Sequence, residues 1–246
     1  MAGAARHDPG TTLRWAREGT GRLLGLVDGL DDEAARAPSL LPGWTRAHVV
    51  AHVARNAEAL GRLAHWARTG DETPMYASPE ARDADIARTA AAPAPALAAD
   101  VRDSAAALDR ALVGVGEDGA WDAEVRGRRG ARVRAALLPW LRTREVWLHA
   151  ADLGLGDPAD ALADAPPGLL EELLSDVAAT LSREAGCPNV VLAATDAEVT
   201  ARLGAEPGPT VRGTRAELVL WLAGRDAGRS RLATDDGDLP TLPRWL

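Results

Sequence analysis

Glu145 and His149 carry side-chain types that bind divalent metals, and they lie four residues apart. On a helix this spacing places both side chains on one face, about one turn apart. Leu138, Leu141 and Leu148 lie on or beside the same face, which predicts that the face points inward. A carboxylate on an inward face is costly unless it is paired or coordinates a metal. The pair therefore indicates part of a metal site.

The same pair could also be stable without a metal. Glu145 and His149 could form a buried hydrogen bond with each other, or the carboxylate could pair with Arg142 or Arg144. The metal interpretation therefore needs a third ligand from elsewhere in the chain.

The sequence holds only five histidines, so the choice of a third ligand is small. His7 lies near the N-terminus, where we expect fraying. His48, His52 and His65 all fall in one predicted helix that Thr45 caps and that runs to about Thr69. Around that helix, His48 lies about 40° from His52, whereas His65 lies more than about 120° away and is expected to face solvent or a domain contact. The apolar neighbours of His52 on the inward side are Val49, Val53, Leu60 and Leu63.

His52, Glu145 and His149 together offer two imidazoles and one carboxylate. This is the ligand set of a catalytic zinc site that leaves a fourth position for water or substrate. Non-haem Fe(II) uses the same set, so the ligand types alone do not choose the metal. His48 could replace His52 as a ligand or support it, and a hydrogen-bonded core histidine is the alternative for His52.

Cys187 is the single cysteine, which excludes an internal disulfide and a cysteine-rich zinc site. It lies in the segment Ala-Gly-Cys-Pro, a predicted loop between a helix and a strand, and we do not expect it to be a catalytic thiol. If the chemistry needs sulfur, a cofactor has to supply it.

Composition excludes several kinds of partner. The 246 residues include 46% hydrophobic side chains and carry a formal net charge of -8, which argues against a nucleic-acid groove or an anionic membrane surface as partner. No apolar run reaches membrane-spanning length, and the N-terminus lacks the core of a signal peptide. We expect a cytoplasmic protein; the oligomeric state is open, and a monomer is favoured.

Four long helices with apolar stripes predict a helical bundle in the first part of the chain. Thr11 or Thr12 is expected to cap the first helix, Pro139 could split the last one, and Gly154 is expected to follow its end. Residues 156–167 have the composition of a linker. A helix, two or three strands and a further helix then predict a small α+β domain. The boundaries are 1–156 for the bundle with its metal site and 165–246 for the α+β domain.

Four segments, in order over nearly the whole chain, resemble the mycothiol-dependent maleylpyruvate isomerase family. LPGWTRAHVVAHVARN (residues 41–56) and LPWLRTREVWLHAADL (138–153) are similar to signatures shared with a wider DinB-like superfamily. TPMYASPEARDADI (73–86) is more specific to the isomerases, and RAELVLWLAGR (215–225) resembles their C-terminal helix.

The resemblance implies a DinB-like four-helix bundle followed by a small sterol-carrier-like α/β domain. It also implies a divalent metal, normally zinc, on the three residues already selected by spacing. Arg225 matches an arginine regarded as essential in the family and would contact substrate or thiol; the alternative is a cation at a helix C-terminus. Arg82 and Tyr76 are weaker candidates for substrate or thiol binding, as is His48; for Arg82 and Tyr76 the alternatives are loop capping and surface packing.

The activity that the resemblance implies is cis–trans isomerisation of maleylpyruvate to fumarylpyruvate, a step of aromatic degradation. A metal-activated thiolate of mycothiol would add to the double bond, allow rotation and leave. The partners would be a small carboxylate substrate and a low-molecular-weight thiol. One alternative is a mycothiol S-transferase that conjugates electrophiles in detoxification or natural-product biosynthesis, and another is a non-catalytic zinc-binding module.

Overall fold

The computed structural model describes residues 7–226 and 229–245, and the chain divides into two compact units, Met1–Gly154 and Leu155–Leu246. The two units are described one at a time. Within the described ranges, no helix combines the length and the apolar character that crossing a membrane requires.

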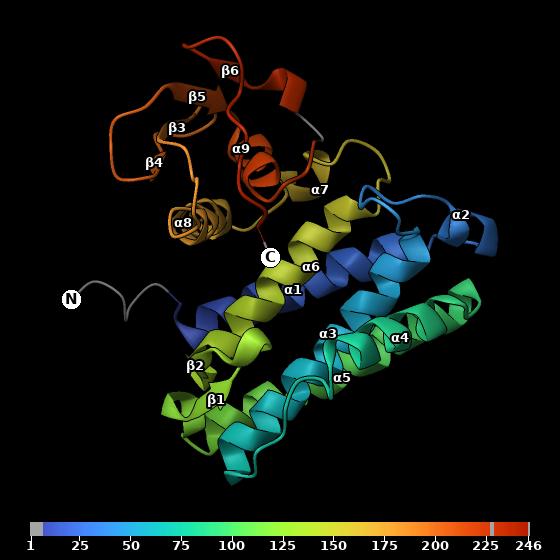
Figure 1. Ribbon diagram of the computed structural model, residues 1–246. Helices are drawn as coiled ribbons and strands as arrows, with labels where there is room; N and C mark the ends of the chain where they lie inside the picture. Colours follow the sequence, from blue (N-terminus) through green and yellow to red (C-terminus); the bar gives the residue numbers. More distant parts are fainter. Residues whose placement is uncertain (1–6, 227–228, 246) are drawn as a thin grey trace. The chain divides into compact units, whose positions relative to one another are not determined.

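The first unit is built from four long helices that run side by side (Figure 1). Helix α3 packs against α5 and α6, and α1 packs against α6 and α5, which closes the bundle and confirms the predicted fold class. The helices of this unit are α1 (Pro9–Val27), α2 (Asp32–Arg36), α3 (Arg46–Thr69), α4 (Pro79–Ala90), α5 (Ala94–Glu117) and α6 (Leu138–Asp152).

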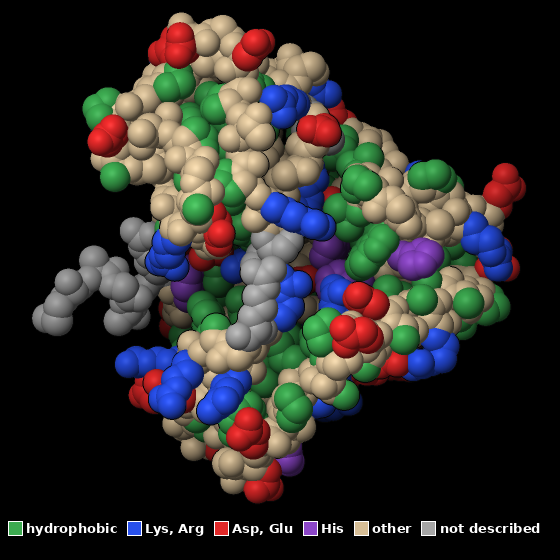
Figure 2. Space-filling model, viewed as in Figure 1, with side chains coloured by type: hydrophobic (Ala, Val, Ile, Leu, Met, Phe, Trp, Pro, Cys, Tyr) green, Lys and Arg blue, Asp and Glu red, His purple; other side chains and the backbone are tan. Residues whose placement is uncertain are grey.

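A short antiparallel hairpin joins α5 to α6. Val125 pairs with Val133 and is buried. Basic side chains gather over this hairpin in Figure 2, so the acidic net charge does not describe every part of the surface. The elements are β1 (Glu124–Arg126), β2 (Arg132–Arg134) and the 3₁₀ turns η1 (Ala120–Asp122), η2 (Arg128–Gly130) and η3 (Ala135–Leu137).

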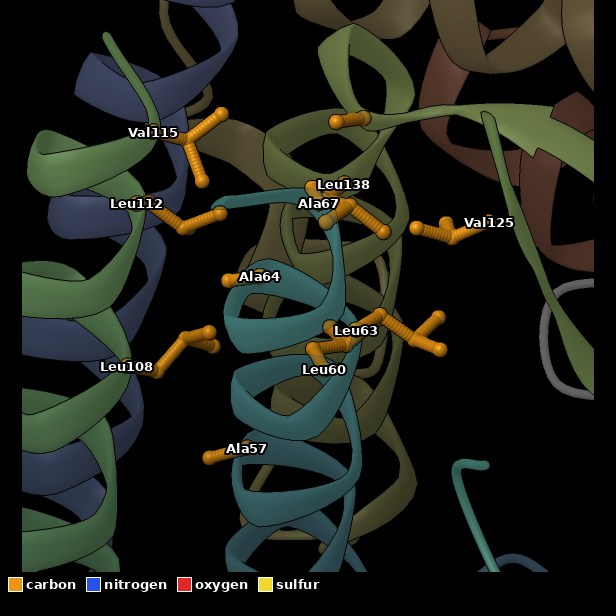
Figure 3. Close-up of a cluster of buried hydrophobic side chains, with 11 residues drawn as sticks. Ala57, Leu60, Leu63, Ala64, Ala67, Leu108, Leu112, Val115, Val125 and Leu138 are labelled. Atoms are coloured by element: carbon orange, nitrogen blue, oxygen red, sulfur yellow. The ribbon is translucent and has the colours of Figure 1, made fainter. Parts of the chain in front are cut away.

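One apolar cluster of the bundle lies along the C-terminal half of α3 (Figure 3). Leu108, Leu112 and Val115 of α5 lie on one side of α3, and Val125 of β1 lies on the other. At 1.5 Å per residue this cluster begins a little more than one helical turn beyond His52. The N-terminal half of α3 is also largely apolar and buried, with Val49, Val50 and Val53 nearly inaccessible to solvent, so His52 lies on an apolar face.

The start of α1 differs from the sequence prediction. Asp8 is the N-cap, because its carboxylate accepts a hydrogen bond from the amide of Thr11 at 2.8 Å, and Pro9 occupies the first turn. Thr12 is buried inside the helix instead. Aspartate followed by proline is a common helix start, since proline has no amide hydrogen to satisfy there.

The ends of α3 and α6 are fixed by side chains and by glycine. Thr45 caps α3, as predicted, and Gly70 ends it with a φ of +80°. Pro139 lies in the first turn of α6 and does not split it, and Gly154 follows that helix with a φ of +63°, as expected.

The side chain of Arg46, the first residue of α3, forms hydrogen bonds with the last two residues of the first unit. Its Nε donates to the carbonyl of Leu153 at 2.7 Å and its Nη2 to that of Gly154 at 3.2 Å. Its Nη1 donates to the carbonyl of Ala34 at 3.2 Å. The two carbonyls directly after α6 thus accept hydrogen bonds from a cation, which suits the negative end of the helix dipole.

The second unit is a mixed sheet in the order β4-β3-β5-β6, with β3 and β5 parallel and the other two pairs antiparallel. Helix α8 packs against α9 and β4, and α9 packs against β5 and β3. The prediction of a linker at residues 156–167 is wrong in part, because helix α7 forms there. Strand β6 is a further element that the sequence did not predict. The elements are α7 (Asp160–Ala163), α8 (Leu169–Leu181), β3 (Val190–Ala194), β4 (Thr200–Leu203), β5 (Thr210–Gly213), α9 (Arg215–Leu222), η4 (Arg229–Arg231) and β6 (Ala233–Thr234).

Candidate metal centre

The fold brings His52 of α3 together with Glu145 and His149 of α6. One ligand atom from each residue lies within 4.8 Å of the others. His52 Nε2 lies 3.0 Å from Glu145 Oε2, and His149 Nε2 lies 3.2 Å from the same oxygen. The two imidazole rings are perpendicular, with centroids 4.7 Å apart. Three potential ligands thus converge from two helices.

Two of the three spacings among these atoms are close to those of ligands around a tetrahedral divalent metal, and the third is within 4.8 Å. Metal–ligand bonds of about 2.0–2.1 Å place neighbouring ligand atoms of a tetrahedron about 3.3 Å apart. The two nitrogen–oxygen distances are close to that value. The side chains of His52 and His149 are 9% and 12% exposed, whereas that of Glu145 is 24% exposed, so the carboxylate stays within reach of a further ligand.

Asp152 orients His149 from one turn further along α6. Its fully buried carboxylate accepts a hydrogen bond from His149 Nδ1 at 2.8 Å. A proton held on Nδ1 leaves the lone pair of Nε2 for a metal. Burial disfavours the imidazolium, but the hydrogen bonds to Asp152 and Glu145 outweigh burial and raise the pKa of His149 to about 9. Without a metal, His149 is therefore a cation at neutral pH.

His52 is in the opposite protonation state. Burial lowers its pKa, although the nearby Glu145 opposes this effect. Its Nδ1 lies 3.2 Å from Nη2 of Arg82, and a guanidinium only donates, so Nδ1 has to accept. The proton of the neutral ring then lies on Nε2 and is donated to Glu145. A metal on Nε2 requires this proton to move to Nδ1, which breaks the hydrogen bond that Arg82 donates to Nδ1.

Glu145 is ionised between the two histidines. Burial alone would raise the pKa of its carboxyl, but hydrogen bonds from His149 and His52 bring that pKa well below its usual value. The metal-free group therefore contains one carboxylate, one imidazolium and one neutral imidazole. A metal dication would replace a single proton of this group, that of His149.

Aromatic and basic side chains surround the group. The ring of Trp44 meets His52 edge-on, with centroids 5.6 Å apart. The guanidinium of Arg82 lies 5.8 Å from the centroid of the Tyr76 ring, and burial raises the pKa of Tyr76, so its hydroxyl is a donor at neutral pH. Arg82 and Tyr76, selected from the sequence, therefore lie beside the histidine–carboxylate group.

The other three histidines are not part of this group. The Nδ1 of His48 lies 3.3 Å from the amide of Thr45 and 2.7 Å from its hydroxyl, which completes a capping box at the start of α3. His65 is exposed, as predicted. His7 is not frayed as expected, because its ring stacks on Trp140 at a centroid distance of 4.6 Å.

Two further residues selected from the sequence lie in the second unit. Arg225 follows α9 and is half-buried; its Nη1 donates to the carbonyl of Ala223 at the end of that helix. This contact is the one expected of a cation at a helix C-terminus. Cys187 lies in the loop between α8 and β3, and burial raises the pKa of its thiol, which is the reverse of activation.

Asp152 and Trp44 are members of this region that the sequence did not predict, and Arg142 has other partners than the one expected. Asp152 had a detectable signal, because an acid three residues after a ligating histidine lies on the same helix face. Trp44 lies in the loop before α3, and its contact with His52 depends on the path of that loop. Arg142 was expected only as a possible partner of Glu145. The structure instead gives it hydrogen bonds to the carbonyl of Val53 and to Asn56.

Comparisons with known proteins give matches for both units. The family model described as the mycothiol maleylpyruvate isomerase N-terminal domain matches residues 16–154, and that of the MDMPI C-terminal domain matches residues 158–244. The chain is also similar to crystal structures of a mycothiol-dependent maleylpyruvate isomerase and of its H52A mutant. Each similarity has 37% identity and a TM-score of 0.84, and covers 96% of this chain and 97% of the other. No curated protein matches the chain.

Proposed function

This chain belongs to the mycothiol-dependent maleylpyruvate isomerase family, and we propose that it converts maleylpyruvate to fumarylpyruvate with mycothiol as its thiol cofactor. The observation that carries the proposal is the convergence of His52, Glu145 and His149 in a member of this family. We propose that these three residues hold a divalent metal and that the metal is zinc. We also propose a cytoplasmic location, because the reaction uses a reduced thiol.

The reaction class explains why a metal and a thiol are both needed. Isomerisation of a cis-enedioyl acid requires temporary loss of its C=C bond, and reversible addition of a thiol meets this requirement. When bound, the metal supplies an open coordination position at which a thiol loses its proton near neutral pH. Cys187 is poorly suited to supply this sulfur, because burial raises the pKa of its thiol.

Side chains around the metal ligands would position the metal and the substrate. Asp152 holds the Nδ1 proton of His149 and so directs Nε2 toward the metal position. Arg82, once released from His52, would pair with a substrate carboxylate, and Tyr76 would donate a hydrogen bond from its neutral hydroxyl. Arg225 is proposed as a catalytic residue that holds a carboxylate and stabilises the negative charge that develops on the substrate.

The direct test follows fumarylpyruvate formation from maleylpyruvate, with zinc-loaded protein and mycothiol. Two variants of histidines on α3 form a matched pair, because His52 faces the other ligands and His65 is exposed. We expect His52→Ala to lose both bound zinc and turnover, and His65→Ala to keep both. Turnover by metal-free protein would contradict the proposed role of the metal.

The same assay separates isomerisation from thiol transfer. A mycothiol S-transferase would give no fumarylpyruvate but would form a stable adduct between mycothiol and a generic electrophile. That outcome would replace the isomerase proposal and keep the metal site. Loading with Zn²⁺, Fe²⁺ or Mn²⁺ in turn identifies the metal that supports turnover.

Arg225 is tested by a change that keeps its charge. Arg225→Lys removes the planar pair of donors that grips a carboxylate, so kcat/KM should fall by about 10–100-fold while zinc content stays unchanged. Arg229→Lys, at an exposed arginine of the same unit, should have no effect. An unchanged kcat/KM in Arg225→Lys would remove Arg225 from the catalytic residues.

A further inference from the structure

Arg142 joins the two helices that carry the proposed metal ligands. It lies on α6 and is buried, with only 2% of its surface exposed. Its Nη1 donates to the carbonyl of Val53 at 2.8 Å and to Oδ1 of Asn56 at 3.0 Å. Both acceptors belong to α3, and Asn56 is buried as well. One guanidinium nitrogen therefore links α6 to α3 inside the bundle.

This link lies about one helical turn from the metal ligands on both helices. Val53 directly follows His52, and Asn56 is four residues beyond His52 on α3. Arg142 is three residues before Glu145 on α6. At 1.5 Å per residue, the link and the contact of His52 with Glu145 are about 4.5–6 Å apart along the helices. A change in the separation of α3 and α6 at the link would therefore also change the distance between the ligands.

A guanidinium is an unfavourable group with which to join two buried helices. Burial lowers the pKa of Arg142 to about 10, so the side chain is still a cation at neutral pH. Its Nη2 is buried and has no hydrogen-bond partner among the residues that the structure describes. Apolar side chains at Arg142 and Asn56 would avoid the cost of burying these polar groups. The link therefore suits a role in fixing geometry better than a role in stability.

We propose that Arg142 is a positioning residue that fixes the separation of α3 and α6 and thereby makes the metal centre selective for a small dication. This inference rests on the proposed metal centre. The distances of 3.0 and 3.2 Å from the histidine nitrogens to Glu145 suit the short bonds of zinc. A larger dication such as Cd²⁺ needs its ligand atoms further apart, and the link opposes that movement.

The charge of Arg142 has a separate effect on the metal. A nearby cation repels Zn²⁺ and Cd²⁺ to a similar extent, so removal of the charge would strengthen the binding of both ions. The link between the helices instead changes the ratio of the two affinities. The ratio, and not the zinc affinity alone, therefore measures the positioning role.

The test measures Zn²⁺ and Cd²⁺ affinities of the full chain by competition with a chromophoric chelator. Arg142→Met removes the link but leaves the buried Asn56 without its donor, which should destabilise the protein. The double variant Arg142→Met/Asn56→Leu replaces both partners by apolar side chains and should recover most of that stability. We expect the preference for Zn²⁺ over Cd²⁺ to fall by about tenfold in both, the lower end of the effect of losing outer partners of metal ligands.

Arg55→Met is the matched control, because it makes the same substitution at another arginine that joins two helices. Arg55 of α3 donates to Asp100 of α5 at 2.6 Å, and α5 carries none of the proposed ligands. The preference for Zn²⁺ over Cd²⁺ should therefore stay unchanged in Arg55→Met. Cobalt(II) gives a second readout, since its visible absorption depends on coordination geometry. The cobalt spectrum should change in both Arg142 variants and not in Arg55→Met.

The double variant decides the outcome if Arg142→Met does not fold. The inference is overturned if the double variant keeps the metal preference and the cobalt spectrum of the unmodified protein. It is also overturned if Arg55→Met changes both as much as the Arg142 variants do. An unmodified protein that binds neither Zn²⁺ nor Cd²⁺ would instead refute the proposed metal centre, and this inference with it.

Discussion

At the scale of single residues, the protons of the histidine–carboxylate group determine how it takes up a metal. His149 is charged at neutral pH, because Asp152 and Glu145 raise its pKa to about 9, whereas His52 is neutral because burial lowers its pKa. Binding of a metal to this group therefore releases one proton, and that proton comes from His149. Since the released proton competes with the metal, the affinity has to depend on pH.

The first prediction is that zinc affinity rises by about tenfold for each pH unit from pH 7 up to about 9 and then levels off. Competition with a chromophoric chelator across this range measures the slope. The Asp152→Asn variant lacks the carboxylate that raises the pKa of His149, so its zinc affinity should stop rising at a lower pH. An affinity that does not change with pH would show that His149 is neutral in the metal-free protein.

The second prediction concerns Arg82, which donates to His52 Nδ1 in the metal-free structure. In Arg82→Gln the amide oxygen can accept from Nδ1, which favours the lone pair on Nε2, and a positive charge near the metal is removed. Zinc should therefore bind about tenfold more tightly, while KM for the carboxylate substrate rises. Calorimetry and steady-state kinetics on the same preparation measure both effects, and weaker zinc binding would contradict the interpretation.

Residue types and helical spacing predicted the three converging side chains, because the positions around a helix axis follow from its geometry alone. The same reasoning separated His52 from His65, which the structure confirms as exposed. It could not predict the contact of Arg82 with His52, since that contact joins α4 to α3 across a loop. It also could not predict that His7 stacks on Trp140, because a terminal segment has no periodic pattern to read.

At the scale of helices, the close approach of α1 to α6 depends on Gly19. A Cβ atom at Gly19 would lie 2.5 Å from Nε1 of Trp147 and 2.6 Å from Cγ2 of Val146. These two residues directly follow Glu145, and the Trp147 indole donates to the carbonyl of Trp15 at 2.9 Å. The packing of α1 therefore helps to fix the helix that carries two of the proposed ligands.

The third prediction compares two glycines of α1. Gly19→Ala should destabilise the protein by about 1–3 kcal/mol through overpacking and should weaken zinc binding. Gly25→Ala, where a Cβ atom meets nothing within 4 Å, should stabilise the protein by about 0.5–1 kcal/mol through helix propensity. Denaturant unfolding measures both changes. Equal effects of the two variants would show that α1 and α6 are not closely packed at Gly19.

Helices were predicted better than their boundaries, for a physical reason. Apolar periodicity over many residues identifies α3 and α5, but one hydrogen bond decides where a helix begins, as Asp8 shows at α1. Pro139 was open to two interpretations, because proline suits a first turn and disrupts an interior. The strand β6 has two residues, and so short a segment has no detectable alternation.

At the scale of the whole molecule, all three proposed metal ligands belong to the first unit. The fourth prediction is that a chelator lowers the unfolding temperature of this unit and leaves that of the second unit unchanged. A ligand at about 1,000 times its Kd stabilises a fold by about 4 kcal/mol, so the shift should be several degrees. Differential scanning calorimetry with and without zinc measures it.

His52→Ala is the control for this measurement, because it should unfold at the same temperature with and without the chelator. Equal shifts of both units would contradict the assignment of the metal to the first one. The division of the sequence at residues 156 and 165 stays a prediction about domains as independent folding units, and the same calorimetric traces test it.

Arg46 ties the last carbonyls of the first unit to the start of α3 and to α2. A break in the peptide chain after Gly154 would leave all three of these hydrogen bonds in place, because each partner lies on the N-terminal side of the break. The segment after Gly154 is therefore a suitable cutting site for a split protein, in which the two halves are expressed from separate genes. A protease site inserted there would release a bundle in which Arg46 still binds the two carbonyls after the final helix.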